Sequence, residues 1–143
     1  MNTLLQITST YERIADLTGR IFIAAIFLES GIGKIGGYAG TQGYMESAGV
    51  PGMLLPAVIA LEIVGAIAII VGYRTQLVAV LLAGFSLLSA LLFHADFGDQ
   101  MQFISFMKNV AIAGGFLVLA ARGAGAWSLD ARRALPAANT RPA

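Results

Sequence analysis

The stretch TQLVAVLLAGFSLLSALLF, residues 75–93, contains no charged side chain. A helix needs about 20 apolar residues to cross the roughly 30 Å of hydrocarbon in a bilayer, and this stretch is long enough. Three further runs of similar length and character lie at 17–35, 53–72 and 103–121. Four such runs in one short chain predict an all-α fold, an integral membrane four-helix bundle.

Composition agrees with a surface that meets lipid. Of the 143 residues, 57% are hydrophobic and only 12% are charged, and the mean hydropathy is +0.78. An average soluble domain carries about 25% charged residues. A soluble chain this short would need polar side chains to cover its large relative surface, and this chain has too few.

The counts of a few residue types exclude several functions. The net charge is +1, so the chain lacks the basic bias that phosphate backbones require, and we expect no nucleic-acid partner. It has no cysteine, which excludes disulfides and cysteine-ligated iron–sulfur clusters within the chain. One histidine excludes bis-histidine haem ligation within one chain. We assign no catalytic residue, and the sequence leaves open whether the chain is an enzyme.

Basic residues predict how the bundle is oriented. We expect one four-span domain over residues 1–130 and a disordered basic tail over 131–143. The link between the first two runs, 36–52, is long enough for a short interfacial helix around Tyr44. Since arginines concentrate on the cytoplasmic side, both termini are predicted to be cytoplasmic in a bacterial inner (plasma) membrane. The arginines on that side are Arg13, Arg20, Arg74, Arg122, Arg132, Arg133 and Arg141.

Polar side chains recur at similar depth in three of the predicted helices. At about 1.5 Å of rise per residue from the cytoplasmic arginines, Glu29 lies roughly 14 Å up, Glu62 roughly 18 Å, and Lys34 and Lys108 roughly 21 Å. Each charge costs about 2.5–3.5 kcal/mol in a membrane helix, so we expect neutral pairs that face inward. The candidate ligand-binding layer is therefore Glu29, Lys34, Glu62, Lys108 and Asn109.

Helical spacing suggests which faces carry this layer. Ala25, Glu29, Gly33 and Gly37 recur every four residues, and small residues on a membrane helix favour close helix contact. Glu29 is therefore expected to face a neighbouring helix. The favoured ion pairs join Lys34 or Lys108 to Glu62. The alternative is that the polar layer only fixes helix packing, with no ligand.

Two further groups could bind ligands. His94, Asp96 and Asp99, in the sequence HADFGD, are a weak metal candidate because histidine and carboxylates suit divalent ions, although such runs are more often solvated loops. Ser128 and Asp130 follow a glycine-rich segment and are expected to anchor the cytoplasmic end by hydrogen bonds.

The ordered set of motifs resembles the DoxX family of small four-helix membrane proteins. The matching pieces cover about residues 18–130, and Lys34, Glu62, Lys108, Asn109 and Asp130 match positions expected in that family, whereas Glu29 does not. The pieces are RIFIAAIFLESGIGKI, GYMESAGVP, ALEIVGAIAIIVGYRT, FMKNVAIAGGFLVL and GAGAWSLD.

The resemblance implies a membrane subunit or accessory factor of an oxidoreductase system, since the family name is attached to thiosulfate:quinone oxidoreductase subunits and to a complex linked with thiol and superoxide defence. The buried polar layer would then hold a quinone or a similar small molecule. The sequence is compatible with oxidoreductase partner subunits and with a homo-oligomer. The rival functions are a small proton-coupled transporter and a non-catalytic assembly or scaffold protein.

Overall fold

The computed structural model describes residues 2–134, and every regular element in this range is helical. The prediction of an all-α membrane bundle is confirmed. The elements in order are α1 (Asn2–Gly36), α2 (Tyr38–Ser47), a 3₁₀ turn η1 (Gly52–Leu54), α3 (Leu55–Val71), α4 (Thr75–Phe93), α5 (Gln100–Arg122) and α6 (Leu129–Ala134).

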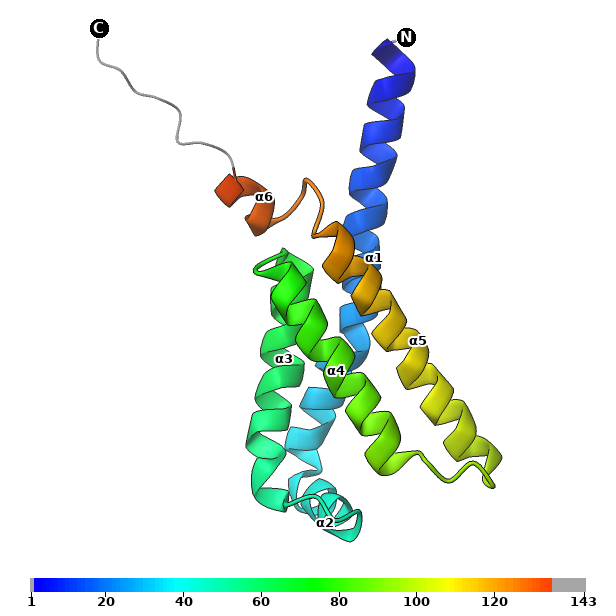
Figure 1. The fold of residues 1–143 in the computed structure, drawn as a ribbon. Coiled ribbons are helices and arrows are strands. Elements are labelled where there is room, and N and C mark those ends of the chain that lie inside the picture. Colours follow the sequence, from blue (N-terminus) through cyan, green and yellow to red (C-terminus); the bar gives the residue numbers. More distant parts are fainter. Residues whose placement is uncertain (1, 135–143) are drawn as a thin grey trace, which may run out of the picture.

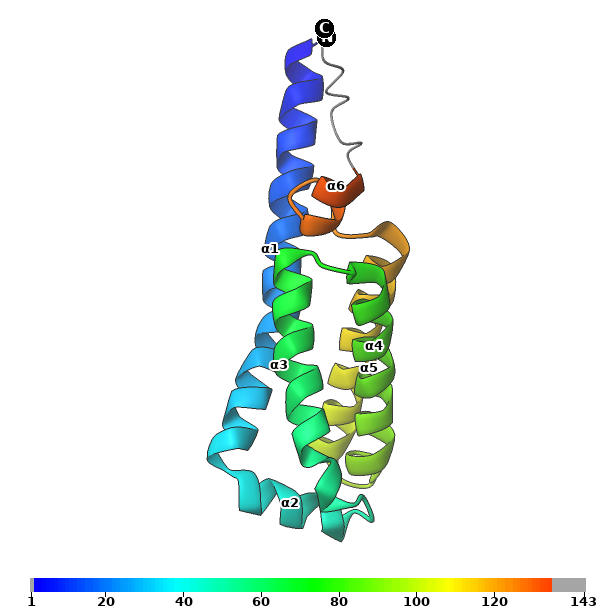
Figure 2. The ribbon, with the colours of Figure 1, turned by 90° about the vertical axis from the view of Figure 1, so that its left-hand side faces the viewer.

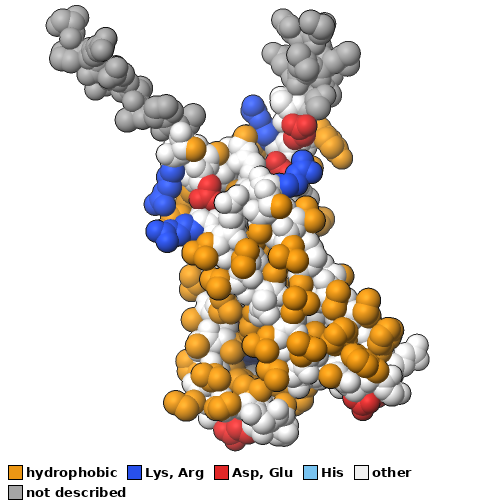
Figure 3. Space-filling view, in the orientation of Figure 1, with side chains coloured by type: hydrophobic (Ala, Val, Ile, Leu, Met, Phe, Trp, Pro, Cys, Tyr) orange, Lys and Arg blue, Asp and Glu red, His pale blue; other side chains and the backbone are white. Residues whose placement is uncertain are grey.

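Three helices are long and apolar enough to cross a membrane by themselves: α3 together with η1, α4, and α5. The helix α1 reaches that standard only together with α2, from which it is bent by 102°. Counted as one span, the bent pair makes a fourth. Apolar side chains cover the middle of the bundle on the face seen in Figure 3, and basic side chains gather at the end near the two termini.

The first helix begins earlier than the apolar run at 17–35 predicted. It starts at Asn2 because no proline or glycine interrupts the polar segment before Gly19, so hydrogen bonding continues without a break. Its first half projects beyond the rest of the bundle (Figure 1). The predicted interfacial helix in the first link is also present, as α2, and it lies across the opposite end of the bundle (Figure 2).

The helices pack mainly as two pairs, α1 with α3 and α4 with α5. Close approach within the first pair depends on Gly31, because a Cβ there would meet Ile63 Cγ1 at 2.6 Å. The helices α3 and α4 are joined by a tight turn in which Gly72 has a φ of +69° and Arg74 a φ of +45°. The left-handed region suits glycine, and here it ends α3.

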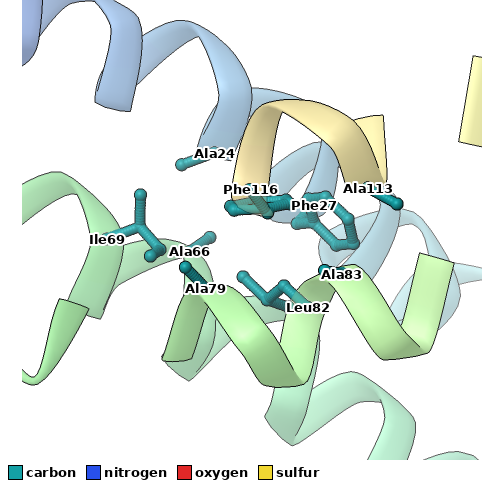
Figure 4. Packing of buried hydrophobic residues seen from close by; sticks show 9 residues of the cluster. All are labelled: Ala24, Phe27, Ala66, Ile69, Ala79, Leu82, Ala83, Ala113 and Phe116. Atoms are coloured by element: carbon teal, nitrogen blue, oxygen red, sulfur yellow. The ribbon is translucent and has the colours of Figure 1, made fainter. Parts of the chain in front are cut away.

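The core lies where the two pairs meet. Phe27 and Phe116 pack edge to face with their ring centroids 5.4 Å apart, in the middle of the cluster (Figure 4). Most of the remaining members are alanines, which let helix backbones approach closely where lipid supplies no hydrophobic driving force. The cluster comprises Ala24, Phe27, Ala66, Ile69, Ala79, Leu82, Ala83, Ala113 and Phe116.

The segment after α5 folds back onto the end of the bundle. The carboxylate of Asp130 accepts hydrogen bonds from the backbone N–H groups of Arg74 and Thr75, each at 2.8 Å, and its own N–H donates to the Gly72 carbonyl at 2.8 Å. Asp130 therefore caps the start of α4 from a distant part of the chain, as the anchoring prediction requires.

The predicted disordered tail of 131–143 is wrong at its start. Residues 131–134 are the end of α6, because the Ser128 hydroxyl accepts a hydrogen bond from the Ala131 N–H at 3.1 Å and so caps this short helix. The rest of the predicted tail, 135–143, lies outside the described residues.

Acid should weaken this anchor. Burial raises the pKa of Asp130, but the N–H donors of Thr75 and Arg74 outweigh it, so the pKa lies below the usual value. The stabilisation is therefore fully present above the unfolded pKa of about 3.9 and is lost as the pH falls through the lower folded value. We expect Asp130→Asn to lower the melting temperature at neutral pH and to flatten its fall below about pH 4.

The measurement is thermal unfolding in mild detergent from about pH 7 down to about pH 3. The control is Glu12→Gln, which removes an exposed carboxylate that caps no helix in the described structure. An Asp130→Asn profile parallel to that of the unmodified protein would contradict the assignment.

Candidate binding pocket

A cavity of about 430 Å³ lies between the helices at the α2 end of the bundle. Most of its wall is apolar and comes from α1, α3, α4 and α5. Among the apolar lining residues are Ile26, Phe27, Val58, Phe85, Leu88 and Ile112. The polar side chains that reach it are Ser30, Lys34, Thr41, Tyr44, Glu62, Ser89, His94 and Asn109.

One ion pair dominates the polar part of the wall. Lys34 Nζ on α1 donates to Glu62 Oε1 on α3 at 2.9 Å, so one of the two favoured pairs is present. Ser30 lies one turn before Lys34, accepts from Nζ at 2.6 Å and donates to the same carboxylate oxygen at 3.2 Å. The three groups therefore form a closed triangle of hydrogen bonds, with Glu62 Oε1 at one corner.

The second oxygen of this carboxylate is unsatisfied. Glu62 is only 3% exposed, and Oε2 has no hydrogen-bond partner among the described residues. A buried polar atom without a partner is costly, and since Glu62 lines the cavity, a molecule bound there is a candidate to donate to this oxygen. An ionised carboxylate only accepts, and the missing partner must therefore carry an O–H or N–H.

Asn109 brings α5 to the same cavity. Its Nδ2 donates to the Ser105 carbonyl at 3.0 Å, which fixes the amide and leaves the second hydrogen on Nδ2. Lys34 also retains one hydrogen beyond the two it gives to Ser30 and Glu62. Of the predicted site residues, Lys34 and Asn109 thus each have a spare donor, and Glu62 has a spare acceptor.

Two of the predicted site residues lie elsewhere. Glu29 is exposed and does not line the cavity, because α1 packs through the face of Ala24, Phe27 and Gly31, and Glu29 lies on the opposite side of the helix. The expectation that its small-residue stripe faces a neighbouring helix is therefore wrong within this chain. Lys108 is exposed as well. It lies about 100° around the axis of α5 from Asn109, so it points away from the cavity that Asn109 lines.

The sequence reasoning missed Ser30, Ser89, Thr41 and Tyr44. Ser30 could have been found, because it precedes Lys34 by four residues and therefore lies on the same helix face. Thr41 and Tyr44 reach the cavity because α2 is bent by 102° from α1 across the bundle end. The link predicted a short helix there, but not which of its side chains would line a cavity. Tyr44 also stacks on Phe93, with centroids 5.4 Å apart.

His94, Asp96 and Asp99, the weak metal candidate, do not come together as a metal site. Within residues 2–134, no group of three or more His, Asp or Glu side chains is placed to hold a metal ion. His94 Nδ1 contacts Gln102 Oε1 at 2.8 Å, and Asp99 accepts from the Gln102 N–H at 3.0 Å as the N-cap of α5. Asp96 accepts from the Gly98 N–H at 3.1 Å. The segment shapes the turn into α5.

Comparison with known proteins identifies the family. The DoxX family model matches residues 15–95. The chain is 50% identical over 119 residues to "Inner membrane protein YqjF" of Escherichia coli (strain K12), covering 83% of this chain and 92% of that protein. It is 42% identical over 140 residues to "Inner membrane protein YphA" of the same organism, covering 92% of this chain and all of that protein. No solved structure gives a significant match.

The family model covers more than half of the chain, and the alignment with each relative covers most of that relative's length. With its membrane-spanning helices, the chain is a membrane protein that belongs to the DoxX family.

Proposed function

We propose that this protein binds a small molecule with a polar head and an apolar body in the cavity between α1, α3, α4 and α5. The observation that carries the proposal is Glu62, a buried carboxylate that lines a mostly apolar cavity and has one oxygen, Oε2, without a hydrogen-bond partner among the described residues. The volume of about 430 Å³ falls in the range of about 300–1,000 Å³ that is typical of small-molecule sites.

The donor set limits the chemistry of the head group. Glu62 Oε2 requires a donor, while Lys34 and Asn109 supply hydrogens to acceptors. A ring that carries hydroxyl groups meets both demands, and the reduced form of a quinone is one such molecule, whereas the oxidised form offers only acceptors, to Lys34 and Asn109. The apolar wall formed by Ile26 and Leu88 then accommodates the body of the molecule.

The residues of the chain would assist such a ligand without themselves changing oxidation state. Lys34 and Asn109 would hold the oxygens of the head group, and Glu62 would accept a proton from a hydroxyl or return it. The oxidation and reduction belong to the ligand and to a partner protein. We propose that the chain is a membrane subunit or accessory factor of an oxidoreductase system in a bacterial inner membrane, with both termini cytoplasmic.

Purification in mild detergent, followed by mass spectrometry of bound small molecules and co-purifying proteins, tests this proposal. We expect a molecule of the stated class at near-stoichiometric amounts. Glu62→Gln should lower its occupancy at least about tenfold, because the variant amide replaces a charged acceptor by a neutral one. The matched control is Glu12→Gln, at the far end of α1, which should leave occupancy unchanged.

The other outcomes would each decide against the site. A bound molecule at equal occupancy in both variants would place the ligand elsewhere. Stable protein partners without any small molecule would favour a scaffold, in which the polar layer only fixes packing. If neither is found, substrate flux in proteoliposomes that depends on Glu62 would favour the transporter.

A further inference from the structure

Two charged side chains remain on the outer surface of the membrane-spanning part. Glu29 on α1 and Lys108 on α5 are both exposed. Within residues 2–134 neither makes an ion pair or a hydrogen bond, in contrast to Lys34 and Glu62. Charged residues within membrane spans are rare and almost always pair with one another or face a polar cavity. Neither condition is met for these two residues within one chain.

The structure brings the two charges to the same depth, in contrast to the roughly 14 Å and 21 Å expected from the sequence, because Arg20 and Arg122, from which those depths were counted, lie at different levels. The helices α1 and α5 are in contact at Ile23 and Gly115, where a Cβ on the glycine would meet Ile23 Cδ1 at 2.8 Å. In Figure 1, α1 runs toward α2 and the antiparallel α5 begins at the same end of the bundle. Glu29 follows Ile23 on α1 and Lys108 precedes Gly115 on α5, so both residues lie on the α2 side of that contact. At about 1.5 Å per residue, Glu29 is roughly 9 Å and Lys108 roughly 10 Å from this contact.

The surface around each charge permits close helix contact. Gly33 follows Glu29 by one turn, and a Cβ built there meets nothing within 4 Å. Ala111 follows Lys108 by one turn and is exposed. Small residues of this kind let a second helix approach closely in lipid. The exposed side chains of Ile26 and Ile32 flank Glu29, so we expect a partner helix to approach along the side of Gly33.

We propose that a second copy of this chain packs against the exposed faces of α1 and α5, with Glu29 of one protomer paired to Lys108 of its partner. A two-fold axis along the membrane normal keeps every residue at its own depth, so a reciprocal pair requires two opposite charges at equal depth. Glu29 and Lys108 satisfy this requirement. The symmetry forms the pair twice, and no charge of the layer then remains in contact with lipid.

Cysteine cross-linking in native membranes tests the contact directly, because the natural chain contains no cysteine. Two differently tagged copies, one Glu29→Cys and one Lys108→Cys, are expressed together and oxidised. We expect a disulfide-linked species that carries both tags, that runs at twice the monomer mass and that reductant removes. The control pair is Val64→Cys with Leu91→Cys, on exposed positions of α3 and α4, and should cross-link at least about tenfold less.

Charge reversal supplies a second measurement that does not depend on oxidation. In liposomes, energy transfer between labelled copies reports the dimer fraction. Glu29→Lys should weaken association at least about tenfold, because like charges then meet, and adding Lys108→Glu should restore it. Unchanged association in the single variant, failure of the double variant to recover, or cross-links that form only within one chain of a Glu29→Cys/Lys108→Cys variant would each overturn the proposal.

Discussion

Alanine in place of Arg20 should lower the free energy of unfolding by about 3 kcal/mol or more. Arg20 is only 1% exposed, and its guanidinium donates to the carbonyls of Ile69 at 3.2 Å and Ile70 at 2.7 Å and also to that of Trp127. The first two carbonyls lie in the last turn of α3, where carbonyls run out of helical partners, although that of Ile69 also accepts from the Gly72 N–H at 3.2 Å. One side chain thus joins α1, the end of α3 and the segment before α6.

Lysine at this position should recover only part of the loss. A guanidinium offers five N–H groups in a fixed fork, whereas an ammonium is a point donor that cannot reach three carbonyls from the same stem. The expected order of stability is therefore Arg20, then Arg20→Lys, then Arg20→Ala. Reversible unfolding in bicelles measures it, with exposed Arg13→Ala expected to stay within about 0.5 kcal/mol. Equal stability of Arg13→Ala and Arg20→Ala would refute the structural role.

Arg20 also illustrates what local sequence could not reveal. Its position before an apolar run predicts only an orientation, because arginine is common at the cytoplasmic ends of membrane helices. Its partners lie 49, 50 and 107 residues away along the chain, and the pattern around it contains no trace of them. Burial of an arginine at a helix end follows only when the final turn of α3 and the segment before α6 are brought to it.

The spans themselves could be predicted because lipid imposes a length and a composition on each helix. The bounds of α4 follow directly, since the uncharged run ends at polar residues on both sides and the helix is Thr75–Phe93. The start of α1 could not be set in this way, because the polar segment before the apolar run is also helical. A composition argument locates the part of a helix that lies in lipid and leaves out what projects into water.

The candidate site was predicted in part. Depth along each helix brought Lys34, Glu62 and Asn109 to one level, and all three line the cavity. It was harder to predict which face of each helix points toward its neighbours. Small residues marked a stripe through Glu29, yet the face that packs is the one with Gly31, one of several glycines on the same helix. Which glycine meets a neighbour depends on the partner helix, and a single sequence does not contain that information.

Methionine in place of Lys34 should be among the most destabilising changes in the membrane part, at about 3 kcal/mol or more. It removes the cation from Glu62, which stays buried with only the Ser30 hydroxyl beside it. Breaking a buried pair by removing one partner typically costs about 3–5 kcal/mol. The side chain of Lys34 is 23% exposed, so the pair is less enclosed than a fully buried one and the lower end of that range is expected.

The variant with both changes, Lys34→Met and Glu62→Leu, separates structure from ligand binding. Replacing a buried ion pair by apolar side chains of similar volume is often neutral or stabilising, so the free energy of unfolding should return close to that of the unmodified protein. Stability is measured in bicelles and ligand occupancy by mass spectrometry. If the pair exists to bind a ligand, the double variant should be stable and empty. If both stability and ligand occupancy recover, the pair serves only helix packing. Additive losses of stability would show that the two side chains are not coupled.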